Sequence, residues 1–437
     1  MTNILIVGHG AREHVITETL SSSGANIYAF MKSKNPGIAK LSKEILLSNL
    51  NNFDKLKTFI KGLNLDFAFI GPEDPLANGI VNFLSKEDIP SIGPFKAPAM
   101  LESSKIFTRN LLEKYKIEGN PKFKIFDSLK GLSSFLDELN DSVAIKPDGL
   151  TGGKGVKVFG DHLRSRQEII DYCKELFSKG SKLIIEEKLI GEEFTLQSFV
   201  DGTHLVGMPL VQDHKRAFND DTGPNTGGMG SYSFNDHLLP FISENDYKKA
   251  ILIMEKSINA VKKETGYEFK GILYGQFMLT KDGPKLVEYN VRFGDPEAMN
   301  VLPLLKSDLI EICEKIISGS LNKIKIKFEN KSTVCKYLAP TGYPINAKPT
   351  EVVVDIEKIK DIGGYLYFAS VDLRGNKIKT TKSRSIAVLG IDEDISKAEQ
   401  IAEQSISYIK GDLFHRTDIG TQKLINKRIE HMNSILN

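Results

Sequence analysis

The sequence has few features that would place the protein outside a reducing, aqueous compartment. Only three of its 437 residues are cysteines, and Cys173, Cys313 and Cys335 lie too far apart for the spacing of a zinc site or a redox pair. Isolated cysteines of this kind are usually small buried apolar residues of a protein that stays in a reducing cytosol. We therefore expect a cytoplasmic protein.

Long apolar runs and an excess of one charge are also lacking. Apolar stretches such as Phe67–Ile70 are far shorter than the roughly 20 residues that span a membrane. The N-terminal run Ile4–Val7 meets the charged stretch Arg12–His14, which is unlike a signal peptide. With 58 Lys and Arg against 56 Asp and Glu, the net charge is only +2, so no overall field attracts nucleic acid or a membrane surface. We expect neither as a partner.

The length and composition are those of a globular protein with about three domains. The chain is 41% hydrophobic and 26% charged. Strands and helices alternate through residues 1–103, which predicts an open parallel α/β sheet. The expected strands are Ile4–Val7, Asn26–Phe30 and Phe67–Ile70, and the expected helices are Glu13–Leu20, Phe53–Lys61 and Leu76–Ser85. Residues 104–320 form a central region with a lid unit near 120–190, and residues 321–437 form a small α+β domain in which no catalytic constellation appears.

The first strand-to-helix turn is rich in glycine. A dinucleotide fingerprint would place its third glycine at position 13, where Glu13 stands, so we expect no NAD. Gly10, Arg12 and Glu13 instead offer backbone donors and charge at a helix N-terminus, where a phosphate binds well. The stretch Gly71–Pro75, which contains Glu73, follows a later strand at the same edge of the sheet, where binding loops gather.

A second glycine-rich loop follows Lys146, the last residue of an expected strand. Its glycines are Gly149, Gly152, Gly153 and Gly155. Glycines let backbone N–H groups approach phosphate oxygens, and Lys146 and Lys154 supply positive charge. The loop is not a Walker motif, because a strand beginning at Val156 follows it instead of a helix. The alternative is a glycine hairpin without a ligand, just as Lys105, at an earlier helix start, could be a solvated lysine.

The strand Lys182–Glu187 leads into further acidic residues, ending at Glu193. The adenine of a nucleotide could bind along this strand through hydrogen bonds to its backbone, with Glu193 near the ribose hydroxyls. A strand with a charged, solvated end is the alternative.

The stretch Lys285–Glu297 combines a strand pattern with several ligand-type side chains. As a half-buried strand it has one polar and one apolar face. The polar face carries Glu288, Asn290 and Arg292, and the apolar face carries Val287, Tyr289 and Val291. Carboxylate and amide oxygens suit Mg²⁺, and Arg292 could then bind a phosphoryl oxygen or a carboxylate. The alternative is an edge strand with an exposed ion pair, which stabilises little, but the acidic turn Gly294–Glu297 that follows favours a site.

Three further segments complete the pattern. An expected hairpin turn at Lys281–Gly283 lets Gln276 face Glu288 across two strands. Asp213–Arg216 and Thr222–Gly230 are polar stretches, the second rich in glycine, that should form exposed loops. Exposed loops on a rigid sheet commonly carry function.

Taken together, the motifs resemble those of the phosphoribosylamine–glycine ligase family, also called glycinamide ribonucleotide synthetases, within the ATP-grasp superfamily. The segments that carry the resemblance are 8–14, 71–73, 104–105, 146–155, 213–216, 222–230 and 288–297. Segments 213–216 and 222–230 are specific to this family, whereas the lysines and the Glu288–Asn290 pair indicate only the superfamily. Small departures occur at Ala11, Thr151–Gly152 and Tyr289. The resemblance extends over nearly the whole chain, as in the single-function form of the enzyme.

The resemblance implies an ATP-dependent carbon–nitrogen ligase of de novo purine biosynthesis, with central ATP-grasp domains between the N-terminal α/β and C-terminal α+β domains. ATP, glycine and 5-phosphoribosylamine would give glycinamide ribonucleotide, ADP and phosphate through glycyl phosphate. Catalysis would consist mainly of charge neutralisation and positioning. The cofactor would be Mg²⁺ or Mn²⁺, and the protein would be a monomer or weak dimer.

The resemblance also implies roles for individual residues. The metal ligands would be Gln276, Glu288 and Asn290. The ATP-binding residues would be Lys105, Lys146, Gly152, Gly153, Lys154, Gly155, Glu186, Glu187, Leu189 and Glu193. The catalytic residues would be Arg292, Lys215, Asp213 and Asp295. The substrates would contact Gly10, Arg12, Glu13, Glu73, Asn225, Thr226, Gly227, Gly228 and Gly294.

Two rival hypotheses remain open. Another ATP-grasp carboxylate–amine ligase or a carboxylase would share the lysines and the Glu288–Asn290 pair, but it should lack the segments 213–216 and 222–230. A nucleotide-sensing module without catalysis would have no use for Glu288, Asn290 and Arg292 together.

Overall fold

The computed structural model describes residues 1–150, 152 and 155–436, and its N-terminal region is the expected open sheet. The five strands are all parallel, in the order β3-β2-β1-β4-β5. They are β1 (Asn3–Val7), β2 (Asn26–Met31), β3 (Ser42–Leu47), β4 (Phe67–Ile70) and β5 (Ser91–Ile92). The helices are α1 (Ala11–Ser22), α2 (Pro36–Leu41), α3 (Phe53–Ile60), α4 (Glu73–Ala77) and α5 (Ile80–Lys86). This confirms the predicted architecture of the N-terminal region.

One predicted helix of this region is wrong. The expected helix Leu76–Ser85 is divided into α4 and α5, because Gly79 between them adopts a left-handed φ of 88°. Glycine adopts such a conformation without the steric cost of a Cβ, so the chain can change direction there.

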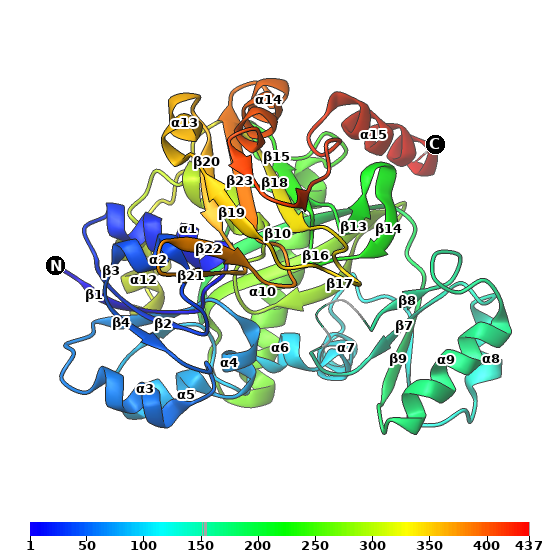
Figure 1. Cartoon of the computed structure of the whole chain (residues 1–437). Coiled ribbons are helices and arrows are strands. Elements are labelled where there is room, and N and C mark those ends of the chain that lie inside the picture. Colours follow the sequence, from blue (N-terminus) through cyan, green and yellow to red (C-terminus); the bar gives the residue numbers. More distant parts are fainter. Residues whose placement is uncertain (151, 153–154, 437) are drawn as a thin grey trace.

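Residues 123–187 form a lobe with a hydrophobic core of its own. Its antiparallel sheet has the order β6-β9-β7-β8. The elements are β6 (Phe123–Phe126), α8 (Leu132–Glu138), β7 (Val143–Pro147), β8 (Lys157–Val158), α9 (Arg166–Ser178) and β9 (Leu183–Glu187). Buried residues such as Leu136, Ile145 and Ile169 pack only within the lobe, which stands apart at the right of Figure 1. A unit with its own core can move as one body relative to the rest.

The central sheet is antiparallel, in the order β11-β10-β16-β17. Its strands are β10 (Glu192–Asp201), β11 (Leu205–Gly207), β16 (Lys270–Thr280) and β17 (Gly283–Asn290). Helix α10 (Glu244–Thr265) begins at the expected cap, where the Ser243 side chain accepts a hydrogen bond from the Asp246 N–H. It packs on the sheet, and its Ser257 hydroxyl lies 2.8 Å from the Tyr289 hydroxyl. The predicted hairpin β16–β17 and the pairing of Gln276 with Glu288 are both confirmed.

The prediction that Val287 lies on the apolar face of β17 is wrong. Gln276 pairs with Glu288 and Phe277 pairs with Leu286, so Val287 is an extra residue at a β-bulge. As a result Leu286 is fully buried in the core, whereas Val287 is only half-buried and lines a cleft. A bulge reverses the alternation of side chains along the strand, and an alternating pattern alone does not reveal it.

The C-terminal region shares a sheet with the central region. This sheet has the order β12-β15-β18-β23-β20. Its strands are β12 (Gln212–Asp213), β15 (Gly230–Ser233), β18 (Ser332–Pro340), β20 (Tyr365–Phe368) and β23 (Ile386–Asp392). A second sheet has the order β21-β22-β19-β24. Its strands are β19 (Glu351–Val354), β21 (Val371–Arg374), β22 (Lys377–Thr380) and β24 (Ile409–Lys410). The helices are α13 (Ile356–Asp361), α14 (Ile395–Ile406) and α15 (Gln422–Leu436). Helix α15 lies beside the hairpin of β13 (Arg216–Phe218) and β14 (Thr222–Asn225) in Figure 1.

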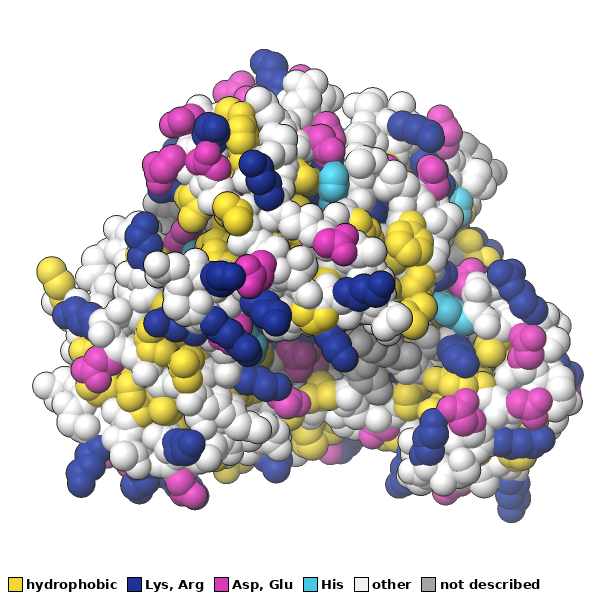
Figure 2. All heavy atoms as spheres, in the orientation of Figure 1, with side chains coloured by type: hydrophobic (Ala, Val, Ile, Leu, Met, Phe, Trp, Pro, Cys, Tyr) yellow, Lys and Arg dark blue, Asp and Glu magenta, His cyan; other side chains and the backbone are white. Residues whose placement is uncertain are grey.

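Buried residues of all three regions belong to one continuous core, which includes Leu5, Leu273 and Val388. The visible face in Figure 2 carries interspersed acidic and basic side chains and is hollowed between the 123–187 lobe and the remainder of the molecule. Cys173, Cys313 and Cys335 are all buried and free. Of the helices in the described part of the chain, none combines the length and apolar character that crossing a membrane requires.

Candidate active site

A cleft of about 1170 Å³ lies between the 123–187 lobe and the central sheet. Most of the residues selected from the sequence line it, although they come from both the N-terminal and the central regions of the chain. They are Arg12, Glu73, Lys105, Lys146, Gly152, Glu186, Glu187, Leu189, Glu193, Asp213, Lys215, Asn225, Thr226, Gly227, Gln276, Glu288, Asn290, Arg292 and Asp295. Gly10, Glu13, Gly155, Gly228 and Gly294 do not line the cleft. Gly153 and Lys154 lie outside the described residues.

The glycine-rich turn between β1 and α1 supports the wall of the cleft, although its glycines do not line it. The Gly10 N–H donates to Glu13 Oε2 at 2.5 Å, and Arg12 Nε donates to Glu13 Oε1 at 2.7 Å. A Cβ at Gly8 or Gly71 would collide with the Glu13 side chain. The Gly10 N–H is therefore not a free donor, contrary to the expectation, and Glu13 fills the space that the third glycine of a dinucleotide turn would leave open.

Arg292 is held by carboxylates from two other elements. Its Nη2 lies 2.9 Å from Glu102 Oε1, in α6 (Met100–Ser103), and its Nε lies 3.3 Å from Glu73 Oε2. The same Nη2 donates to Asn290 Oδ1 at 2.9 Å. This fixes the direction of the guanidinium, which remains at the surface of the cleft. Glu102 was not selected from the sequence, although it stands two residues before the Ser104–Lys105 motif.

The two carboxyl groups around Arg292 differ in their protonation. Burial raises the pKa of Glu102 to about 7, although Arg292 opposes the shift. For Glu73, burial would also raise the pKa, but Arg292 and Arg12 outweigh it and lower the value to about 2. Glu73 is therefore ionised at neutral pH, whereas Glu102 titrates near neutrality.

Lys146 is positioned by a buried ion-pair cluster. Its Nζ lies 2.7 Å from Glu186 Oε2 and donates to the Val287 carbonyl at 3.0 Å. Arg109, in α7 (Lys105–Lys114), holds both oxygens of Glu186, at 2.6 and 3.0 Å, and donates to the same Val287 carbonyl at 2.8 Å. Burial alone would raise the Glu186 pKa, but Arg109 and Lys146 outweigh it and lower the pKa. Glu186 thus positions Lys146, and it offers no free oxygen to a nucleotide.

Glu288 differs from these paired groups. Within the described part of the chain, no donor makes a hydrogen bond or ion pair to its carboxylate. Its pKa is nevertheless lowered, because the charges of Lys215, Lys146 and Lys105 together outweigh the effect of burial. A carboxylate that faces several cations across a cleft, without contacting them, leaves room for a ligand that carries charge of its own.

The donor set around Glu288 fits a hard metal ion shared with phosphates. Glu288 and Asn290 offer oxygens, although Asn290 Oδ1 already accepts from Arg292, and Gln276 donates its amide to Glu193. The described residues contain no cluster of three His, Cys, Asp or Glu side chains that could hold a metal alone. Mg²⁺ is commonly bound by one or two protein groups together with substrate phosphates, and the residues present match that pattern.

The opposite wall offers contacts for a nucleotide base and sugar. Glu193 Oε2 lies 3.1 Å from Lys215 Nζ, and Glu187 Oε1 accepts from the Lys122 N–H at 2.9 Å. Leu189 lies between β9 and β10, and its backbone N–H and carbonyl have no hydrogen-bond partner among the described residues. Lys105 Nζ donates to the Gly149 carbonyl at 2.7 Å, which ties the start of the glycine loop to α7.

The remaining wall is crosslinked by a residue that sequence reasoning missed. Arg384 Nη1 donates to the carbonyls of Gly227 and Gly228, both at 2.7 Å, and its Nη2 lies 3.3 Å from Asp295 Oδ1. The guanidinium also lies over the Tyr337 ring, 4.4 Å from its centroid. The C-terminal region, whose sequence shows no catalytic constellation, therefore helps to frame the cleft through this side chain. No local motif marks Arg384, because its partners are distant in the sequence.

Asp213 is a partly buried acid of this wall. Its Oδ1 has no hydrogen-bond partner in the described structure, and burial together with the charge of Glu297 raises its pKa well above the ordinary range. Glu297 is itself buried and accepts a hydrogen bond from the Tyr274 hydroxyl at 2.8 Å. For Lys215, burial would lower the pKa, but Glu193 and Glu288 outweigh it and raise the value.

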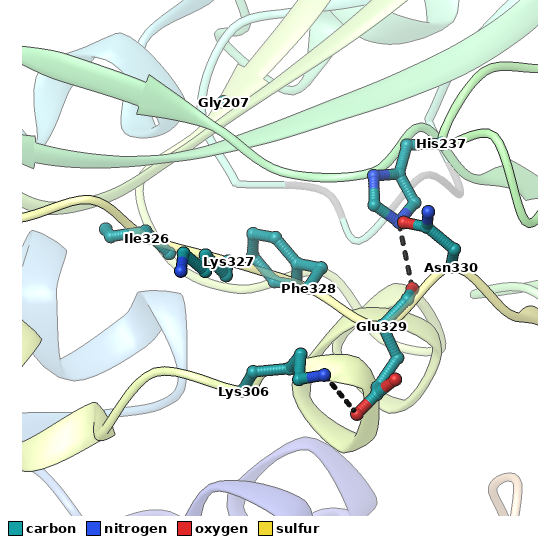
Figure 3. A pocket seen from close by; sticks show the side chains of 8 residues that line it. All are labelled: Gly207, His237, Lys306, Ile326, Lys327, Phe328, Glu329 and Asn330. Atoms are coloured by element: carbon teal, nitrogen blue, oxygen red, sulfur yellow. Dashed lines mark hydrogen bonds and ion pairs between the residues drawn. The ribbon is translucent and has the colours of Figure 1, made fainter.

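A second hollow, of about 630 Å³, lies away from this cleft and lacks comparable chemistry. Figure 3 shows His237 Nε2 within 2.9 Å of the Glu329 carbonyl and Lys306 Nζ within 3.2 Å of the Glu329 carboxylate. His237, Lys306 and Glu329 are thus engaged with one another. The large cleft is the candidate active site.

Comparison with known families covers most of the chain. Models of phosphoribosylglycinamide synthetase match three consecutive segments: the N domain matches residues 2–102, the ATP-grasp (A) domain matches residues 103–298, and the C domain matches residues 333–422.

Individual relatives agree over the full length. A phosphoribosylamine–glycine ligase of Methanococcus vannielii is 50% identical over 442 residues, covering 99% of this chain and 100% of the relative. Another, of Methanobrevibacter smithii, is 48% identical, covering 99% of this chain and 100% of the relative. The crystal structure of phosphoribosylamine–glycine ligase from Thermotoga maritima is similar with a TM-score of 0.81 and 27% identity, covering 95% of this chain and 100% of that one.

Proposed function

Because the chain belongs to the phosphoribosylglycinamide synthetase family, we propose that it joins glycine to 5-phosphoribosylamine with ATP as co-substrate. Family membership rests on the three matched segments and on relatives that are about half identical over their whole length. The observation in the site that supports the proposal best is the carboxylate of Glu288, which faces Lys105, Lys146 and Lys215 without contacting any of them.

The proposed reaction has two steps. A glycine carboxylate oxygen attacks the γ-phosphorus of ATP, which forms glycyl phosphate and releases ADP. The amine of phosphoribosylamine then attacks the glycyl carbonyl, the C–O bond to phosphate breaks, and the amine loses a proton. The products are glycinamide ribonucleotide, ADP and phosphate. Both steps require charge neutralisation and alignment more than covalent help from the protein.

On the ATP side, Lys105 and Lys146 neutralise phosphate oxygens, and Glu186 with Arg109 holds Lys146 in place. Lys154 and the glycines at 152, 153 and 155 would close over the phosphates. Mg²⁺ or Mn²⁺, held by Glu288 and Asn290 with Gln276 nearby, would neutralise charge on the transferring phosphoryl group. Leu189 would offer to adenine its backbone groups, which have no partner among the described residues, and Glu187 and Glu193 would contact the ribose hydroxyls.

On the acceptor side, Arg292 binds the transferring phosphoryl group or the glycine carboxylate. Its fixed direction, set by Glu73 and Glu102, avoids reorganisation during the reaction. Asp213, Lys215, Asp295 and the segment 225–228 orient the amino substrates. Arg12 and Glu73 extend this surface toward the N-terminal sheet, with Gly10, Glu13 and Gly294 supporting it.

We also propose the domain division 1–103, 104–320 and 321–437, with residues of about 120–190 acting as a lid. A lid with its own core can close over ATP and exclude water from the acyl phosphate. We also propose a cytoplasmic protein, which the buried free cysteines support, and a monomer or weak dimer.

The test is an assay of ADP release by the purified full chain. ADP should appear only when glycine and freshly prepared phosphoribosylamine are both present, and either substrate alone should give background. Equal rates with aspartate or bicarbonate in place of glycine would contradict the proposal and favour another ligase or a carboxylase of the same fold.

A further inference from the structure

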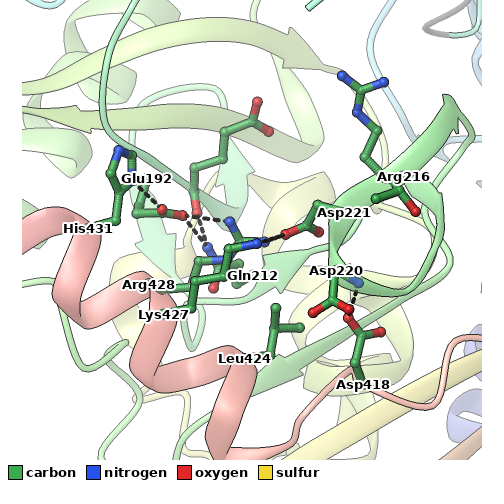
Figure 4. A network of polar contacts seen from close by, with 12 residues as sticks. Glu192, Gln212, Arg216, Asp220, Asp221, Asp418, Leu424, Lys427, Arg428 and His431 are labelled. Carbon is green, nitrogen blue, oxygen red and sulfur yellow. Dashed lines mark hydrogen bonds and ion pairs between the residues drawn. The ribbon is translucent and has the colours of Figure 1, made fainter.

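Helix α15 contributes side chains to the wall of the cleft, a role that its sequence does not indicate. Lys427, Arg428 and His431 all line it. Figure 4 shows these residues directed toward β10 and toward the loop that begins at Asp221. The end of the C-terminal region therefore lies against both halves of the site.

One end of this contact is Glu192, the first residue of β10. Its side chain is buried, with His431 Nδ1 at 2.6 Å from Oε1 and Arg428 Nη1 at 3.5 Å from Oε2. Gln212 donates to the same Oε2 at 3.3 Å and to the carbonyl of Glu193 at 3.1 Å. Holding Glu192 fixes the backbone between Leu189 and Glu193, which forms the nucleotide wall.

The other end is Asp221, the residue before the segment Thr222–Gly230. Arg428 Nη2 donates to Asp221 Oδ2 at 2.6 Å, and Arg416 Nη1 lies 3.1 Å from Oδ1. Burial would raise the pKa of Asp221, but Arg428 and other nearby cations outweigh it and lower the value to about 2. Asp221 therefore stays ionised and paired. It directly precedes strand β14, which leads into the acceptor loop, residues 225–228.

We propose that Arg428 is a positioning residue that couples the nucleotide wall to the acceptor loop of the same active site. The proposal rests on the proposed function. A planar guanidinium can reach two carboxylates in fixed directions at once, whereas an ammonium group on a flexible stem acts as a single point charge. Arg428 is mostly buried, and its Nε has no partner among the described residues, so the two carboxylates at its Nη atoms determine its orientation.

The test compares three full-length variants by steady-state kinetics. Arg428→Gln should raise both the KM for ATP and the KM for glycine by roughly tenfold, the factor expected when one charge-assisted hydrogen bond is lost, with kcat changed much less. Arg428→Lys keeps the charge but can serve only one carboxylate, so at most one of the two KM values should recover. Glu430→Gln is the matched control, because Glu430 lies on the same helix, is exposed and has no ion-pair partner among the described residues.

Hydrogen exchange and binding of Mg²⁺–ADP by calorimetry provide readouts that do not require turnover. In Arg428→Gln, amide exchange should rise at both 188–193 and 219–226 and ADP should bind more weakly, while Glu430→Gln stays like the original protein. If the protein fails to ligate glycine but these changes occur, the proposed function fails and the coupling stands. Unchanged exchange and ADP binding, exchange altered at only one segment, or full recovery of both KM values by Arg428→Lys, would overturn the coupling.

Discussion

The two sides of the cleft hold their charges in different ways. On the acceptor side, Arg292 is paired with Glu73 and Glu102, and Arg384 is paired with Asp295 and two loop carbonyls. On the ATP side, Glu186 also pairs with Lys146, but Glu288 faces several lysines and has no hydrogen-bond or ion-pair partner among the described residues. The arginines of the acceptor side are therefore paired before any substrate binds, whereas the ATP side is completed only when its ligands bind.

The largest effect is expected at Glu288, where the ligand completes the site. Glu288→Gln keeps the size of the side chain and removes its charge. The metal ion at the phosphates should then lose a ligand, and turnover should fall on the order of a thousandfold. The melting temperature should change little, because no partner among the described residues is lost. Glu244→Gln, at an exposed ion pair, is the control. Near-normal turnover of Glu288→Gln at saturating Mg²⁺ would sink the metal assignment.

The second largest effect concerns the free energy of unfolding and involves Glu102 on the acceptor side. Glu102 has a folded-state pKa of about 7 against an ordinary 4.5, so the folded protein binds this proton more tightly than the unfolded chain. Its contribution to stability should be lost as pH rises from about 4.5 to 7, by about 3 kcal/mol, and stay constant above that range. Glu102→Gln should abolish this pH dependence.

Urea unfolding of the original protein and of Glu102→Gln at pH 5 and pH 8 measures the difference. The variant should gain stability relative to the original protein at the higher pH. An identical pH dependence in both proteins would show that Glu102 is ionised throughout and that Arg292 outweighs its burial.

A smaller and more selective effect is expected at Arg384. Arg384→Gln removes the hydrogen bonds to Gly227 and Gly228, so the KM for the amino substrates should rise roughly tenfold while the KM for ATP stays unchanged. Lys382→Gln, two residues earlier, serves as the control. A rise in the KM for ATP of the same size would mean that Arg384 also organises the ATP side.

The smallest effect is protection of the glycine loop by nucleotide. If ligands complete the ATP side, ATP with Mg²⁺ should slow tryptic cleavage within 149–155 several-fold, because a loop bound to phosphates spends less time open to the protease. Cleavage at Lys325, an exposed residue outside the lid, should proceed at the same rate with and without nucleotide. Equal cleavage of the 149–155 loop in both conditions would count against a lid that closes on ATP.

Much of the fold and the family could be predicted from the sequence. The parallel N-terminal sheet, the capped helix α10 and the hairpin β16–β17 follow from local patterns, and the structure confirms them. The resemblance that the motifs carried is confirmed by the family models and the full-length relatives. The bulge at Val287 and the break at Gly79 were missed, because both depend on how neighbouring elements pair and pack.

The sequence by itself determined which chemical groups are available and where local structure directs them, because side-chain direction within a strand or turn depends on adjacent residues. Only the tertiary structure decided which charges are paired. Arg109 meets Glu186 across 77 positions of sequence, and Arg384 meets Gly227 across 157. An ion pair depends on distance in space and on burial, which no local spacing encodes. For that reason Glu186 proved to be a support for Lys146, whereas Glu288 remains open to a ligand.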